Sequence, residues 1–101
     1  MLFAVIRKGG PAWDASRPLR EQDGWDEHAA YMDALFEAGF FVFAGPLGDG
    51  NPEHRVLQVV EADGHETINA RLADDPWTPT GILETVSVER WNVLVGELTG
   101  R

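Results

Sequence analysis

The chain has 101 residues, of which 44% are hydrophobic and 25% are charged, a composition typical of one globular domain spanning residues 1–101. Its 17 acidic and eight basic residues give a net charge of −9, which argues against nucleic acid or an anionic membrane as a partner, because phosphate recognition needs a basic surface. The absence of cysteine excludes disulfides and thiolate chemistry, and no apolar run approaches the roughly 20 residues of a membrane span, so we expect a cytoplasmic protein.

The chain begins with an apolar run from Leu2 to Arg7, which predicts a first strand. The connection from Lys8 to Gly24 is rich in Gly, Pro and Arg, and its length is typical of a functional loop or lid. These basic residues could select an anionic small molecule, or they could simply balance nearby acids on a solvated surface, which is the simpler interpretation. Half of all the basic residues of the chain lie in one 14-residue stretch that begins just before this connection: Arg7, Lys8, Arg17 and Arg20.

Residues 25–38 have the apolar spacing of an amphipathic helix. Asp23 is suited to the N-cap position of this helix, and Gly39 to the C′ position that ends it. We therefore expect one well-delimited helix after the long connection.

The next segment predicts two strands joined by a loop. Phe40 to Ala44 form an aromatic-rich strand, which Gly45 and Pro46 should end. Residues 47–54 carry further glycine and proline and predict a hairpin loop, and residues 55–61 predict a third strand.

The last part of the chain predicts a helix and a strand. Asp63 and Glu66 have the spacing of a capping box and should open a helix that runs to about Ala73. Residues 85–91 predict a fourth strand, with Leu94 as its furthest end.

The order β-α-β-β-α-β predicts an α+β protein of the ferredoxin-like type, with both helices on one face of an antiparallel sheet. A sheet whose other face met water should alternate apolar and polar residues, but residues 2–6 and 40–44 are apolar on both sides. The second face therefore needs a cover. We expect a homodimer in which two sheets pack face to face as a dimeric α/β barrel.

His28 is the most unusual residue of the first helix. It lies on one stripe with Met32, Leu35 and Phe36, where an aliphatic side chain would ordinarily pack. Because a buried polar group is unfavourable without a hydrogen bond, His28 needs a partner from elsewhere in the chain.

A candidate partner follows the second helix. Asp74 and Asp75 lie at the negative end of the helix dipole, where each is unfavourable by about 0.3–1 kcal/mol. A residue that contradicts its local preference without visible compensation indicates a functional site. In a split βαβ fold this helix end can approach the first helix, so one of these aspartates could reach His28, and Trp77 could form the wall of a pocket.

A paired histidine and aspartate can carry out acid–base chemistry. Histidine ordinarily titrates near pH 6.5, a carboxylate bonded to one ring nitrogen fixes its tautomer, and the other nitrogen can then take or give a proton. The alternative is a structural role, in which Asp75 merely satisfies a buried His28.

The chain resembles the YCII-related family, small proteins with a ferredoxin-like fold that pair into a dimeric α/β barrel. The resemblance covers nearly the whole chain after Leu2 and rests on an ordered set of motifs: His28-x-x-Tyr31-Met32-x-x-Leu35-x-x-x-Gly39, Ala44-Gly45-Pro46-Leu47, Asp75-Pro76-Trp77, Gly81-Ile82-Leu83 and Trp91.

This resemblance implies that His28 and Asp75 form an active-site dyad. One characterised type of member removes chloride from a chlorinated hydroxyquinol, which implies a lyase-like enzyme acting on a small organic, aromatic or anionic substrate. Gly45, Pro46 and Trp77 are the candidate substrate-binding residues, although a turn and core packing also explain them.

We expect no cofactor and no metal site, and the expected partners are a second copy of the chain and a small molecule. His54 and His65 are predicted to be ordinary surface residues. Two other functions stay open: a non-catalytic ligand-binding or regulatory module, and a cofactor-free monooxygenase or muconolactone-isomerase-like barrel, which shares the architecture.

Overall fold

A computed structural model of the chain describes residues 1–48 and 53–96. A 3-10 turn, η1 (Leu19–Glu21), precedes the first helix, and the predicted element order is confirmed. In chain order the strands and helices are β1 (Leu2–Gly9), α1 (Trp25–Glu37), β2 (Phe41–Pro46), β3 (Val56–Glu61), α2 (His65–Ala73) and β4 (Leu83–Arg90).

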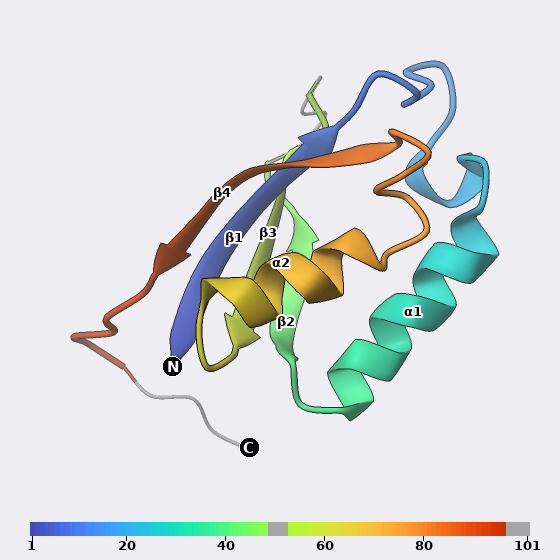
Figure 1. Cartoon of the computed structure of the whole chain (residues 1–101). Helices are drawn as coiled ribbons and strands as arrows, with labels where there is room; N and C mark the ends of the chain where they lie inside the picture. The colour runs from blue at the N-terminus through green and yellow to red at the C-terminus, as the bar shows by residue number, and fades with distance from the viewer. Residues whose placement is uncertain (49–52, 97–101) are drawn as a thin grey trace.

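The four strands form one antiparallel sheet in the order β2-β3-β1-β4. Both helices cover the same face of this sheet (Figure 1). This is the ferredoxin-like α+β arrangement predicted from the element order.

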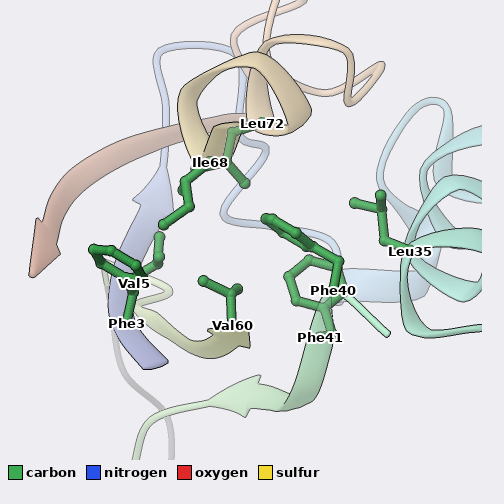
Figure 2. Close-up of a cluster of buried hydrophobic side chains, with 8 residues drawn as sticks. All are labelled: Phe3, Val5, Leu35, Phe40, Phe41, Val60, Ile68 and Leu72. Carbon is green, nitrogen blue, oxygen red and sulfur yellow. The ribbon is translucent and has the colours of Figure 1, made fainter. Parts of the chain in front are cut away.

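The main core lies between the helices and the sheet (Figure 2). Side chains of β1 alternate in burial, with Phe3 and Val5 facing the helices. Ile68 and Leu72 of α2 pack in the same cluster, together with Leu35 of α1. The inward-facing side chains of β1, α1 and α2 therefore form one apolar layer.

The opposite face of the sheet is apolar and only partly buried within the described chain. The register pairs Phe43 with Val59 and Val59 with Ala4, which places these three side chains in one row on the face away from Val5. Phe43 is 53% exposed. The two-sided apolar character of the strands is confirmed, whereas the homodimer that would cover this face stays a prediction.

Three strand ends differ from the predicted ones by two residues, and one of them is the start of β4, at Leu83 and not at residue 85. The first strand runs on to Gly9, because it pairs with β3 as far as Arg7 and with β4 to its end. Gly45 and Pro46 were expected to end β2, but they lie within it. Proline is tolerated there because β2 is an edge strand, whose outer side has no ladder bonds to lose. In the hairpin loop, residues 49–52 lie outside the described part.

Both predicted helix N-caps are wrong. Gly24 precedes α1 with φ of +76°, and Gly64 precedes α2, and neither position has a side-chain cap bond. Asp23 instead uses its backbone oxygen to accept the indole N–H of Trp77 at 2.7 Å. Gly39 follows the C-cap of α1 with φ of +83°, as predicted for C′.

Phe36 was predicted to lie on the core stripe of α1, but it is 62% exposed. The stripe that reaches the core passes through Leu35, so Phe36 lies beyond its edge. The two exposed phenylalanines therefore occupy opposite sides of the molecule: Phe36 on a helix and Phe43 on the open face of the sheet.

Because Phe43 is exposed on the sheet and Phe36 is exposed on a helix, substitutions at these two residues can test the sheet face as a homodimer interface. We expect the wild-type chain to sediment at micromolar concentration with twice the mass of one chain. Phe43→Lys should shift it toward the monomer, because a lysine charge would be buried between the two sheets. Phe36→Lys is the matched control and should leave the mass unchanged. A wild-type chain that sediments purely as a monomer would disprove the interface.

Candidate functional site

The structure brings His28 and Asp75 into direct contact. His28 lies in the first turn of α1, and Asp75 follows the C-cap of α2. Nδ1 of the imidazole lies 2.8 Å from Oδ1 of the carboxylate, and both side chains are buried, with Asp75 fully inaccessible. The contact joins two segments that are 47 residues apart.

Asp75 accepts hydrogen bonds at both oxygens. The backbone N–H of Trp77 donates to Oδ1 at 3.0 Å, and Nη1 of Arg7 donates to Oδ2 at 2.6 Å. Burial alone would raise the pKa of the Asp75 carboxyl, but the hydrogen bond and charge of His28, the Trp77 N–H and Arg7 outweigh burial and hold the pKa below its usual value of 3.8. Asp75 is therefore an anion at neutral pH.

Arg7 is a site residue that the sequence reasoning missed. It was assigned to a surface cluster, yet it is fully buried, and its Nη2 also donates to Oγ1 of Thr78 at 2.8 Å. The missed signal is the period of two along β1, because Phe3, Val5 and Arg7 share the inward face. An arginine in a core row needs a buried anion, and Asp75 supplies it.

The other basic residues of that predicted cluster do not converge on one site. Lys8 lies 3.7 Å from Glu84, and Arg17 lies 3.0 Å from Asp14. Surface ion pairs of this kind contribute little to stability. Lys8 and Arg17 match the simpler interpretation of the sequence, in which basic residues balance nearby acids, whereas the guanidinium of Arg20 lies over the Trp25 ring, 6.0 Å from its centroid.

The imidazole of His28 is held by aromatic contact as well. It stacks on the indole of Trp77, with ring centroids 3.9 Å apart and planes within 7° of each other. Trp25 contacts the same imidazole in a tilted arrangement at 5.8 Å. Stacking and the bond to Asp75 together fix the orientation of the His28 ring.

His28 also lines a cavity of ≈ 230 Å³ between α1 and the sheet. Gly45 and Pro46 of β2, two of the predicted substrate-binding residues, lie in its wall. Trp77 does not, because it lies against the His28 ring and lines a separate cavity of ≈ 390 Å³. The full wall of the His28 cavity consists of Leu19, Trp25, His28, Met32, Phe41, Ala44, Gly45, Pro46, His54, Val56, Gln58 and Leu83.

Four of these wall residues carry a polar atom in the side chain: His28, His54, Gln58 and, through its indole N–H, Trp25. His54 was predicted to be a surface residue, but its ring stacks on Trp13 with centroids 4.0 Å apart. Burial lowers the pKa of His54 below 6.5. Sequence patterns missed both residues, since a loop histidine and a strand glutamine show no distinctive spacing.

Among the described residues, three buried side-chain atoms have no hydrogen-bond partner: Nε of Arg7, Nε2 of His54 and Oε1 of Gln58. A buried polar atom left without a partner is unfavourable by about 1–3 kcal/mol. Two of these three atoms belong to residues that line the His28 cavity, where a bound molecule could supply the missing hydrogen bonds.

The arrangement favours proton transfer at one ring atom of His28. Nδ1 is bonded to Asp75, which leaves Nε2 without a hydrogen bond to any described residue, and the His28 side chain lines the cavity. In residues 1–48 and 53–96 no three His, Asp or Glu side chains are grouped so as to hold a metal ion. No helix in the described part has the length and apolarity to cross a membrane.

Two of three comparisons with known proteins find a match. The model of the YCII-related domain matches residues 1–92. No curated protein matches the chain. Among solved structures, the fold is similar to that of 5-chloro-2-hydroxyhydroquinone dehydrochlorinase from Burkholderia phenoliruptrix AC1100, in complex with 2,5-dihydroxybenzoquinone. The TM-score is 0.68 and the identity 28%, covering 91% of this chain and 94% of that one.

The buried ion pair leads to a stability prediction. Asp75→Asn should lower the free energy of unfolding by about 3–5 kcal/mol, because it leaves the Arg7 charge buried without a counter-ion. Urea denaturation followed by circular dichroism measures the change. Asp74→Asn is the matched control, because the neighbouring Asp74 is exposed. Equal losses in both variants would contradict a special role for Asp75.

The lowered pKa of Asp75 also predicts how stability depends on pH. The folded protein binds this proton more weakly than the unfolded chain does, so the carboxylate stabilises the fold above about pH 3.8. That contribution should be lost as the pH falls below 3.8 and through the lower folded pKa. Unfolding free energies measured from pH 6 to pH 3 should fall more steeply in the wild type than in Asp75→Asn. Parallel curves would contradict the assignment.

Proposed function

This chain belongs to the family of YCII-related domains, and on that premise we propose that it is a small enzyme in which His28 transfers a proton on a small ring-shaped substrate. Asp75 orients the imidazole and stabilises its charged form during the reaction. The observation that carries this proposal is the two-sided environment of His28, with Nδ1 bonded to a buried carboxylate and the ring in a cavity wall.

The cavity supports a catalytic role for His28 over a purely structural one. A structural histidine would need only its bond to Asp75 and its stacking on Trp77, and an apolar side chain could seal its other edge. Instead, His28 borders ≈ 230 Å³ of space. This accessible edge is what a group exchanging protons with a substrate requires.

The wall of the cavity favours an uncharged aromatic substrate. Eight of its twelve residues have no polar N or O atom in the side chain, and none is Lys, Arg, Asp or Glu. Arg7, the buried cation near His28, is already paired with Asp75 and is not part of this wall. A hydroxylated ring fits this chemistry better than a carboxylate or a phosphate does.

The similar dehydrochlorinase suggests elimination of HCl as the reaction. A general base takes the proton of one ring hydroxyl, and the ring carbon that bears chlorine gains a proton as that oxygen becomes a carbonyl. A second hydroxyl then loses its proton while the C–Cl bond breaks and chloride leaves, which yields a quinone. The sequence is redox-neutral, and one histidine can move each proton.

We further propose that the active form is a homodimer. The apolar row of Ala4, Phe43 and Val59 would pack against the same row of a second chain, in the dimeric α/β barrel that the strand pattern predicts. The cavity lies on the helix side of the sheet, so it would stay accessible in such a dimer.

The function is tested by chloride release from 5-chloro-2-hydroxyhydroquinone. His28→Ala should lower the rate by about 10²- to 10⁴-fold, the usual contribution of a general acid–base group. His65→Ala is the matched control, since His65 lies outside the cavity. Sedimentation and circular dichroism should show that both variants keep the fold.

Equal rates in His28→Ala and the wild type would exclude His28 as the proton-transfer group. Binding of the ring without chloride release, and without exchange of ring hydrogens in D₂O, would favour the non-catalytic ligand-binding module instead. Oxygen consumption in the same assay would favour the monooxygenase.

A further inference from the structure

The His28 cavity contains a second polar region, contributed by the sheet rather than by α1. Gln58 lies on β3, and His54 lies in the loop that leads into β3. Each has a buried polar atom without a partner among the described residues: Oε1 of Gln58 and Nε2 of His54. Both side chains line the same cavity as His28, so the unmet hydrogen bonds and the proton-transfer group share one space.

Gln58 occupies a position where an apolar side chain would be expected. It pairs with Val5 on β1 and Ala44 on β2, so it faces the helices from the middle of the sheet. Only 2% of its surface is exposed. A buried amide is unfavourable unless something completes its hydrogen bonds, and no protein group in the described part bonds to Oε1. A ligand in the cavity is the available donor.

His54 is held in place before any ligand binds. Its ring stacks on Trp13, and the backbone N–H of Gly9 donates to the carbonyl of the preceding Glu53 at 2.9 Å. His54 has φ of +50°, and no other described residue except glycine has a positive φ. Such a conformation is unfavourable and is concentrated at ligand sites. Because burial lowers its pKa, the His54 ring is neutral at pH 7 and can donate or accept a hydrogen bond.

We propose that Gln58 and His54 are the recognition residues of the cavity and select an uncharged single-ring substrate that carries a hydroxyl group away from the reacting end. Oε1 of Gln58 accepts the hydrogen bond of that hydroxyl, and Nε2 of His54 bonds to the same group or its neighbour. This inference deepens the proposed function and rests on it, because His28 must act at the other end of the ring.

The size of the cavity agrees with one ring. An apolar cavity of about 150 Å³ is known to take up benzene. The ≈ 230 Å³ beside His28 therefore accommodates one substituted ring, and it is below the range of about 300–1,000 Å³ typical of larger ligands. His28 comes from the helix side and Gln58 from the sheet side, so a single ring can reach both.

The test compares binding of the three dihydroxybenzene isomers and their dimethyl ethers, which keep no hydroxyl donor, to the full chain, measured by NMR titration under nitrogen. The best-binding isomer should bind the wild type about tenfold more tightly than its ether, because the methoxy group cannot donate to Oε1 of Gln58. Gln58→Met keeps the unbranched shape but removes the acceptor, so the ratio should fall to near one. Met32→Leu, an apolar exchange in the same wall, is the control and should keep the ratio.

A second variant tests the histidine. His54→Phe keeps a flat ring against Trp13 but removes both nitrogens, and it should weaken binding of the dihydroxybenzene about tenfold. His65→Phe, outside the cavity, should not weaken it. The comparison of isomer and ether in the wild type needs no variant, so it tests recognition of the hydroxyl group even where a variant fails to fold.

Three results would overturn the inference. They are equal binding of isomer and ether by the wild type, an unchanged ratio in folded Gln58→Met, and no binding of any isomer. These readouts measure binding alone, whereas the proposed function is judged by chloride release and His28→Ala. Loss of recognition by Gln58 and loss of proton transfer by His28 are therefore separate outcomes.

Discussion

The buried carboxylate of Asp75 is the group on which the rest of the structure depends. It receives hydrogen bonds from Arg7 on β1, from His28 on α1 and from the backbone of Trp77 in its own turn. A fully buried anion is tolerated only where such donors replace its hydration, so these segments must meet at one point. The unfavourable place of Asp75 at the end of α2 is offset by a cation that the sheet supplies.

Because of this network, the two sides of the His28 ring have different surroundings. One ring face stacks on Trp77 and Nδ1 is bonded to Asp75, while Nε2 has no hydrogen bond to any described residue. The orientation of the His28 ring is therefore fixed, while the side chain still borders the cavity. Arg7 does not reach the cavity, so its charge acts through Asp75, which it keeps ionised beside the imidazole.

Several features could be predicted from the sequence because they depend on local pattern. The order of helices and strands, their apolar faces and the end of α1 at Gly39 follow from periodicity and from the conformational freedom of glycine. Two misfits, a histidine on an apolar stripe and two aspartates at the wrong helix end, predicted the kind of partner, and the family resemblance chose Asp75 from the two. The N-cap of α1 could not be predicted in this way, because the backbone oxygen of Asp23 accepts a long-range hydrogen bond from Trp77 that the local pattern does not show.

The sequence by itself determined the fold class, the family and the contact between His28 and Asp75, since each is encoded in spacing or in an ordered set of motifs. Only the tertiary structure decided that Arg7 is the buried counter-ion, that Trp77 lies behind His28 and not in the cavity wall, and that His54 and Gln58 share that wall. The physical reason is strand register and long-range packing. Arg7 and Asp75 are 68 residues apart, and only the assembled sheet and helices bring such side chains into contact.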